Sequence, residues 1–402
     1  MNNINNKICQ CNNSFSYKKY KCKEIRFLSY FFAFVRKNIK VKNKELLIEK
    51  FRNFYIANMQ NEILKVDDLL NDDGSLKHKG YAKKLLLKYD RNKIKAPKWR
   101  IKEWDYYLVY NNDFAIAFTI SDNSYMALDS LTLIDFKKAK EHTNSPMRFF
   151  TNGKTNFPST SKIGDVESLN KKVHFSFKND GNKRILEVNF PNFMKGITCN
   201  VYCELTEEPQ DSMVIATPFF KNKKAFYYNQ KIVGFKANGY IEYDNQKYEF
   251  TSSNTRGILD WGRGVWTYKN TWYWGAGAFI QDNHEIGFNI GYGFGDTSNA
   301  SENMIFFDGK AHKLDQVTFN IPIDKKGKES YLEPWTFTSN DNRFVMTFKP
   351  IIDRHADTDL KILCSLQHQV FGVFNGTMIL DDGTQVKIVN QIGFAEKVFN
   401  KW

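Results

Sequence analysis

Apolar and polar positions alternate with a period of two through much of this chain. The segment 288–295 shows the pattern clearly, because large apolar residues take every second position and Asn or Gly takes the others. A period of two is typical of a β-strand with two unlike faces. The face made of Asn and Gly has almost no side-chain volume, so we expect a neighbouring backbone, a bulky ring from another strand or a ligand close to it.

Turn-forming residues separate the alternating segments. They are Asn or Asp, often followed by Gly, at 179–181, 244–245, 308–309, 340–342 and 381–383. Such residues suit the tight turns of antiparallel hairpins. Helical patterns are few, and short helices are expected only at 81–89 and 135–141. Aromatic residues make up 16% of the chain, and strands favour them. The sequence therefore predicts an all-β, antiparallel fold of two barrel-like or sandwich-like units, 59–230 and 231–402.

Residues 1–58 differ from the rest in composition. They hold 13 Lys/Arg against 3 Asp/Glu, a net charge of +10. The apolar stretch 25–35 is too short to span a bilayer as a helix, so no integral membrane span is expected. Two interpretations stay open for this poorly structured or helical extension. It is either a basic, aromatic anchor at a membrane surface or, as we prefer, an upstream extension of a protein whose translation starts at Met59.

The remaining chain shows no sign of a nucleic-acid, cofactor or disulfide protein. Its net charge is +4 without a dense basic stripe, so nucleic acid is not an expected partner. Cys199, Cys203 and Cys364 form no CxxC pair, so we expect free thiols in a reducing, cytoplasmic compartment. Walker A, GxSxG and HExxH motifs are absent from the sequence. The GxGxG at 291–295 lacks the dinucleotide spacing and precedes a strand pattern, so no cofactor is expected.

One alternating set has the residue types of metal ligands, namely Asp353, His355, Asp357 and Asp359. On a strand these side chains would share one face, where they could bind a metal ion. The same set would also arise in an exposed loop after Pro350. We prefer the loop, so no metal is expected.

Aromatic and ionisable residues are most concentrated in 256–314, where four of the eight tryptophans fall between Trp261 and Trp274. Asp260 and Arg263 lie among these rings. A regular strand would turn the two to opposite faces, whereas a bulge or turn at the glycine between them would let them meet. They are either a buried structural ion pair, the preferred interpretation, or the catalytic residues of a site.

Further residues are candidates for binding a ligand. They are Trp261, Trp266, Trp272, Trp274, Asn289, Asp296, Glu302 and Asn303. Glu103 and Asp105 add an acid pair, because residues two apart on a strand share a face. That pair faces either a cavity or solvent. Solvent is the preferred interpretation, since carboxylates are rarely buried unpaired.

Several short motifs carry a family resemblance. They are DWGRGVW (260–266), WYW (272–274), GFGD (293–296) with ENM (302–304), DGKAHKL (308–314), KEWDYY (102–107), FYYNQKI (226–232), FGVFNG (371–376) and LDDG (380–383). Together they resemble the bacterial DUF2804 family over about residues 61–402. That family has no assigned function. It is similar in turn to lipocalin-type double-barrel proteins, which include carotenoid hydratases and tocopherol cyclases.

The resemblance implies two lipocalin-like barrels that bind or chemically modify a small apolar molecule, lipid-like or isoprenoid-like. In those relatives an Asp in an aromatic cavity protonates an alkene, and ring faces stabilise the resulting cation. Asp260 with the four nearby tryptophans is the closest match in this sequence. Two alternatives stay open, a lipid-binding protein without chemistry and a carbohydrate-binding or carbohydrate-modifying protein.

Overall fold

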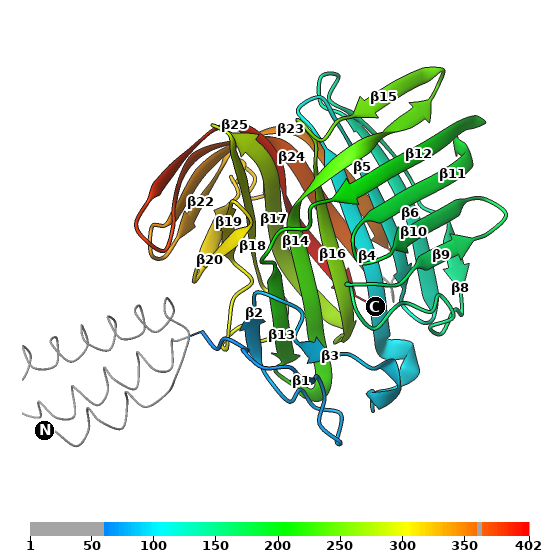
Figure 1. Ribbon diagram of the computed structural model, residues 1–402, viewed down its shortest axis with the longest axis vertical. Coiled ribbons are helices and arrows are strands. Elements are labelled where there is room, and N and C mark those ends of the chain that lie inside the picture. Colours follow the sequence, from blue (N-terminus) through cyan, green and yellow to red (C-terminus); the bar gives the residue numbers. More distant parts are fainter. Residues whose placement is uncertain (1–59, 360–363, 402) are drawn as a thin grey trace, which may run out of the picture. The chain divides into compact units, whose positions relative to one another are not determined.

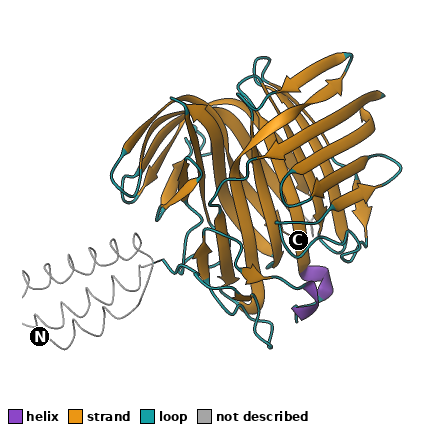
Figure 2. Ribbon diagram, in the orientation of Figure 1, coloured by secondary structure: helices purple, strands orange, loops and turns teal. Residues whose placement is uncertain are grey.

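A computed structural model describes residues 60–359 and 364–401, and almost all of its regular structure is β (Figures 1 and 2). Its helices are two 3₁₀ turns in this part of the chain, η1 (Arg91–Lys93) and η2 (Lys98–Arg100). The prediction of an all-β fold is therefore confirmed. The predicted extension 1–58 and Met59 lie outside the described residues.

The first large sheet has fourteen strands within the described residues. Ten follow one path: β7 (Lys140–Asn144), β6 (Met126–Asp135), β5 (Phe114–Asp122), β4 (Ile101–Tyr110), β16 (Arg256–Val265), β14 (Asn222–Tyr243), β12 (Ile197–Thr206), β11 (Arg184–Met194), β10 (His174–Asn179) and β9 (Val166–Leu169). The others branch from it: β2 (Gly80–Ala82), β8 (Met147–Phe149), β13 (Met213–Phe219) and β15 (Gln246–Phe250). The sheet curls on itself, as contacts between two strands far apart in its order show. The side chains of His142 and Asn144 on β7 hydrogen-bond to the Phe193 carbonyl on β11 at 2.9 and 2.8 Å.

The second sheet has nine strands and also curls (Figure 1). In spatial order they are β20 (Lys310–Lys313), β19 (Met304–Phe307), β18 (His284–Tyr292), β17 (Lys269–Gln281), β25 (Gln385–Lys401), β24 (Cys364–Ile379), β23 (Phe344–Asp359), β22 (Trp335–Ser339) and β21 (Val317–Asn320). A separate parallel pair joins β1 (Asp67–Asp68) and β3 (Leu87–Lys88). Neighbouring strands in both large sheets are antiparallel, as the hairpin turns predicted.

The chain passes from the first sheet to the second between Val265 and Lys269. The position 230/231, predicted as a domain boundary, falls inside β14, which runs from Asn222 to Tyr243. The division into two domains stays a prediction.

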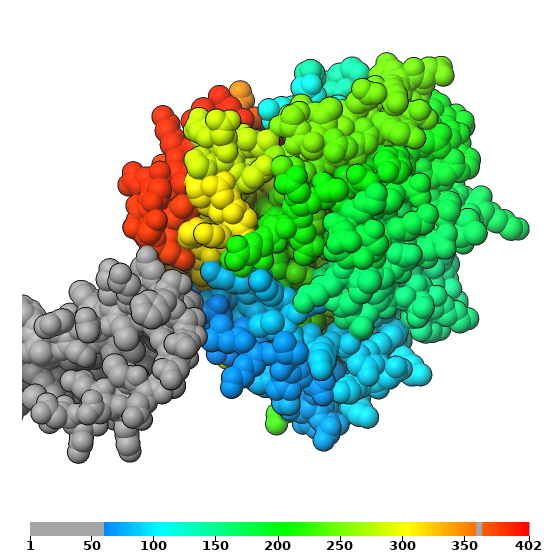
Figure 3. Space-filling view, viewed as in Figure 1, coloured from blue at the N-terminus to red at the C-terminus, as the bar shows by residue number. Residues whose placement is uncertain are grey.

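The alternating pattern of β18 has the predicted two faces. Phe288 and Ile290 are buried in the core enclosed by the second sheet. The glycine face turns toward the first sheet. There Val233 of β14 lies so close to Gly287 that an added Cβ would come within 2.7 Å of its Cγ1, and the Glu302 carboxyl covers Gly291 in the same way at 3.1 Å. The small face is thus filled by side chains from another strand and a loop, along a seam where the sheets meet (Figure 3).

Three local predictions are wrong. Segments 81–89 and 135–141 were expected to form short helices, but they contain parts of β2, β3, β6 and β7. Segment 353–359 was expected to be a loop, but it completes β23, which pairs with β24 along its length. In each case hydrogen bonding to a neighbouring strand outweighs the local composition, because strand preference depends strongly on tertiary context.

Gly262 illustrates how tightly the first sheet is packed. The Trp104 indole lies over it, and an added Cβ would be 1.9 Å from Cζ2 of that ring. Gly262→Ala should therefore lower the free energy of unfolding by about 1–3 kcal/mol, the usual cost of overpacking. Urea unfolding measures the change, with Thr318→Ala at an exposed strand position as control. Equal stability of the two variants would contradict this packing.

Candidate functional site

Strand β16 divides the predicted site between two faces. Residues paired across an antiparallel ladder share a face. Asp260 pairs with Lys231 of β14 and Tyr106 of β4. Arg263 pairs with other residues of the same two strands and points to the opposite side, into the space enclosed by the first sheet. Asp260 therefore faces the second sheet and Arg263 does not.

Asp260 forms a buried ion pair with Lys231. The Lys231 ammonium lies 2.7 Å from one carboxylate oxygen, and the Asn229 amide donates to the other at 2.5 Å. The same ammonium lies 3.9 Å from the centre of a Trp274 ring from the second sheet. The predicted pairing of Asp260 with Arg263 is wrong, because β16 continues without a bulge at Gly262. The carboxylate is thus held by two donors from β14.

Arg263 has its own partner inside the first sheet. It donates to Asp105 at 2.9 Å, and its guanidinium lies 4.2 Å from the Trp261 ring centre. Glu103 accepts from Tyr89 at 2.8 Å and pairs with Arg91. Glu103 and Asp105 therefore share a face, as predicted.

That face is buried, so the preferred solvent-exposed interpretation is wrong. Burial raises the pKa of Asp105 against the opposing charge of Arg263. The Glu103–Arg91 and Asp105–Arg263 contacts explain how both acids can be buried at all, since an isolated buried charge is too costly.

A second carboxyl, Glu396 of β25, joins Asp260 from the opposite sheet. It lies directly across the ladder from Trp274. Trp272 and Gln369 donate to its two oxygens at 3.0 and 3.1 Å. Burial raises its pKa to about 7, well above the ordinary 4.5. At neutral pH a large share of this carboxyl therefore keeps its proton.

A third carboxyl, Glu302, comes from the loop between β18 and β19. Burial raises its pKa, the charge of Asp260 adds to this shift, and Lys231 opposes it. The same two charges act on Glu396, where Arg354 is a further nearby cation, and Lys313 is a further cation near Glu302. The Tyr106 hydroxyl is buried beside them and has no hydrogen-bond partner among the described residues. We call Tyr106, Lys231, Asp260, Glu302 and Glu396 the inter-sheet cluster.

The predicted tryptophans take different places around this cluster. Trp272 and Trp274 contact it through Glu396 and Lys231. Trp266 packs against Trp272, with 5.8 Å between ring centres. Trp261 lies on the other face of β16, beside Arg263. The structure therefore brings two of the four rings directly to the acids.

The polar residues predicted as ligand-binding in 289–303 also have different places in the structure. Asn289 accepts from the Trp274 indole at 2.8 Å and donates to the Glu302 carbonyl at 2.8 Å, so it positions both. Asn303 accepts from the Gly291 backbone at 2.7 Å and holds the loop to β18. Asp296 accepts from the backbone of its own turn, with no contact to the cluster among the described residues.

Sequence reasoning missed Lys231, Glu396 and Tyr106. Tyr106 and Glu396 have apolar neighbours two positions away on the same strand face, Trp104 and Leu108 for the first and Phe394 and Val398 for the second. This pattern could have identified these two residues, because a polar group that is buried needs a partner. Lys231 follows Asn229 and Gln230, and no local signal sets it apart.

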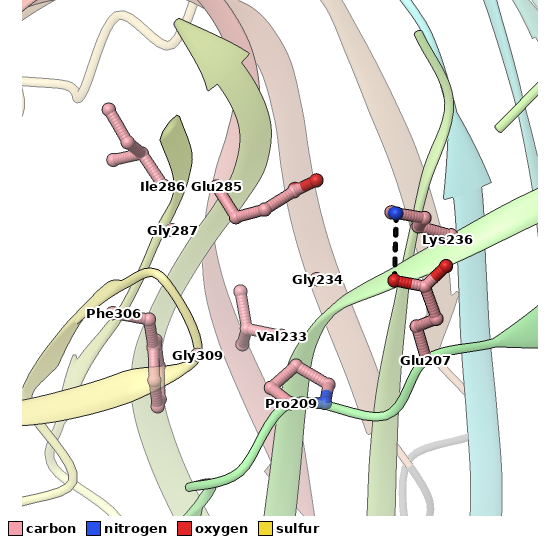
Figure 4. A pocket seen from close by; sticks show the side chains of 10 residues that line it. All are labelled: Glu207, Pro209, Val233, Gly234, Lys236, Glu285, Ile286, Gly287, Phe306 and Gly309. Carbon is pink, nitrogen blue, oxygen red and sulfur yellow. Dashed lines mark ion pairs between the residues drawn. The ribbon is translucent and has the colours of Figure 1, made fainter. Parts of the chain in front are cut away.

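A groove of about 80 Å³ opens on the seam near the cluster (Figure 4). Its floor includes Val233 and Gly287, and the ion pair of Glu207 and Lys236, 2.7 Å apart, lies at its side. Val233 is two residues from Lys231 on the same face of β14. The groove is therefore one residue layer outside the cluster.

The described residues contain no group of three or more His, Cys, Asp or Glu side chains suited to a metal ion. Within the same residues, no helix has the length and apolar character needed to cross a membrane.

Comparison with known families settles the relationship of the chain. The family model described as a domain of unknown function, DUF2804, matches residues 60–402. The chain belongs to the DUF2804 family. A comparison of this DUF2804 chain with curated proteins gives no match.

Two solved structures are similar to this DUF2804 protein in fold. An AttH candidate from Nitrosomonas europaea is 12% identical with a TM-score of 0.49, covering 77% of this chain and 96% of its own. Kievitone hydratase from Nectria haematococca is 10% identical with a TM-score of 0.41, covering 75% and 88%. At these scores the similarity says nothing about the chemistry of this chain.

Proposed function

We propose that this DUF2804 protein is an acid–base enzyme that acts on a small, largely apolar molecule between its two sheets. The observation that carries the proposal is the inter-sheet cluster itself, in which Glu396 and Glu302 are buried beside the Asp260–Lys231 ion pair. Burial makes the ionised form of a carboxyl costly, so such a group tends to keep its proton. Such arrangements are concentrated at functional sites, where a group that titrates near neutral pH can transfer a proton.

Glu396 is the proton donor in this proposal, in place of the Asp260 suggested by the sequence. Asp260 accepts from Lys231 and Asn229, so donors from β14 already occupy both of its oxygens. Glu396 is protonated for a large share of the time at neutral pH. Asp260 instead fixes Lys231 over the Trp274 ring.

The reaction that suits these groups is protonation of an alkene. Glu396 gives its proton to one alkene carbon, and positive charge develops on the other. The faces of Trp272 and Trp274 would stabilise that charge, since aromatic faces attract cations. Loss of a proton from a neighbouring carbon, or addition of water with release of its proton, returns a proton to the Glu396 carboxylate. The rings of Trp272 and Trp274 beside Glu396 and Lys231 would suit a small apolar substrate.

The test is deuterium transfer from solvent. A molecule that co-purifies with the full chain is identified by mass spectrometry and returned to ligand-free protein in D₂O. Deuterium on a carbon atom of the molecule, appearing faster than without protein, is the expected result. A bound molecule that takes up no deuterium would contradict the enzymatic proposal and favour a lipid-binding protein, and a bound sugar would favour the carbohydrate alternative.

Val233 lies against Gly287 in the lining of the groove (Figure 4), and we take this groove, one residue layer from the cluster, as the route for the substrate. Val233→Ala should therefore raise acrylamide quenching of tryptophan fluorescence by exposing Trp274. The control is Val201→Ala, which removes the same volume from a buried position on β12. Equal quenching in the two variants, or an increase that persists when Trp274→Phe is added, would contradict this route.

A further inference from the structure

The second sheet carries another group of ionisable residues on the face turned away from the inter-sheet cluster. His368 of β24 lies across the ladder from Lys397 of β25 and from His355 of β23. Lys397 is next to Glu396 in sequence, so the two point to opposite sides of the strand. His368 and the core residue Val370 are two apart on β24 and share a face. The group therefore lies on the inner face of the second sheet, separate from the cluster.

His368 has the setting of an activated base. Its Nδ1 lies 2.7 Å from Oδ2 of Asp353. A carboxylate at this nitrogen holds the proton on Nδ1, so the ring lone pair lies on Nε2. The other Asp353 oxygen is buried and has no hydrogen-bond partner among the described residues.

Two flat rings fix the plane of the His368 imidazole. The Tyr331 ring stacks on it with 3.7 Å between centres and 8° between planes. His355 stacks on it at 4.4 Å and 13°. The His368 side chain keeps 16% of its surface exposed and that of Asp353 keeps 14%, so the ring is held in place without being fully buried.

A cation stands beside this base. The Lys397 ammonium contacts both oxygens of Glu329 at 2.6 Å, and Glu329 also accepts from the Tyr331 hydroxyl at 2.6 Å. Tyr273 is a further neighbour of the ammonium, which lies 5.4 Å from the centre of its ring and interacts with its hydroxyl. The base His368 and the cation Lys397 are thus direct neighbours on paired strands, with the Tyr331 ring beside them.

We propose that this group is a second catalytic site that hydrolyses small aryl esters, with His368 as general base. Nε2 takes a proton from water while the water oxygen bonds to the ester carbonyl carbon. The negative charge that develops on the carbonyl oxygen lies beside Lys397. The bond from that carbon to the aryl oxygen then breaks, the aryl alcohol leaves with the proton held by His368, and a carboxylic acid remains. Asp353 acts through His368 and is a positioning residue.

The test is hydrolysis of p-nitrophenyl acetate by the full chain. His368→Gln should lower the enzymatic rate by roughly 10²-fold, the low end of general-base contributions. The chain offers a matched control in His284, whose Nδ1 lies 2.8 Å from Oδ2 of Asp308. Both residues of that pair are exposed. His284→Gln should leave the rate unchanged.

Asp353→Asn separates a positioning role from a structural one. It should lower kcat and leave KM and the melting temperature nearly unchanged. If His368→Gln does not fold, site-resolved modification of the unsubstituted chain by diethyl pyrocarbonate replaces it, and His368 should react several times faster than His284. A rate that survives His368→Gln, an equal loss in His284→Gln, or slower modification of His368 would overturn the proposal.

Discussion

Glu396→Gln is expected to lower the rate of deuterium transfer from solvent to the bound molecule by about 10²–10⁴-fold, the usual contribution of a positioned proton donor. Glutamine has the same shape and can still accept from Trp272, so the variant should fold and bind the molecule. Mass spectrometry of the molecule measures the transfer. The control is Glu249→Gln, which neutralises a carboxyl that is 67% exposed. Equal transfer by Glu396→Gln and the unsubstituted chain would contradict the role of Glu396.

The same variant should change how stability depends on pH. Burial raises the Glu396 pKa from 4.5 to about 7, so the folded chain binds more protons than the unfolded chain between these values. Stability therefore falls as pH rises from 4.5 to 7, and the loss is complete above that range. The loss is on the order of 3 kcal/mol at 1.36 kcal/mol per pKa unit. Urea unfolding should show a shallower fall for Glu396→Gln than for the unsubstituted chain, whereas parallel curves would contradict this pKa.

Lys231→Met is expected to lower the free energy of unfolding by about 3–5 kcal/mol, because it leaves Asp260 buried without its cation. Adding Asp260→Asn should recover most of the loss, since no uncompensated charge then remains. Urea unfolding of the two single variants and the double variant measures the coupling. An unchanged stability of Lys231→Met, or a double variant no more stable than Lys231→Met, would contradict a buried pair.

The matched control for this experiment is an ion pair of the same length on the surface. Lys183 lies 2.7 Å from Glu204, with side chains 43% and 28% exposed. Lys183→Met should cost less than about 1 kcal/mol, as exposed pairs do. The difference in stability lost between Lys231→Met and Lys183→Met then measures the effect of burying the ion pair.

The alternation of residues was enough to predict the two faces of β18. In 288–295 it predicted both a packed apolar face and a close neighbour on the small face, and Glu302 supplies that neighbour at Gly291. Asp260 and Arg263 are three positions apart, so a regular strand turns them to opposite faces, as observed. Their predicted contact required a bulge at Gly262, which the local sequence does not exclude but the strand does not contain.

The partners across the sheets could not be predicted. Lys231 lies 29 positions before Asp260 and Glu396 lies 136 positions after it. Which residues meet depends on the register of β14 against β16 and on how the two sheets pack, and neither is encoded in a local pattern. The same holds for Asp353, whose strand is defined by pairing with β24 and not by its own polar composition.

A carbon-13 NMR titration of the glutamate side-chain carboxyls tests the central claim most directly, which is that a carboxyl between the sheets holds its proton at neutral pH. Comparison with Glu396→Gln assigns the Glu396 signal. We predict that this signal titrates near pH 7, well above the ordinary glutamate value of 4.5, and that Lys231→Met moves its midpoint upward because a neighbouring positive charge is lost. A Glu396 signal that titrates at the ordinary value would contradict the account.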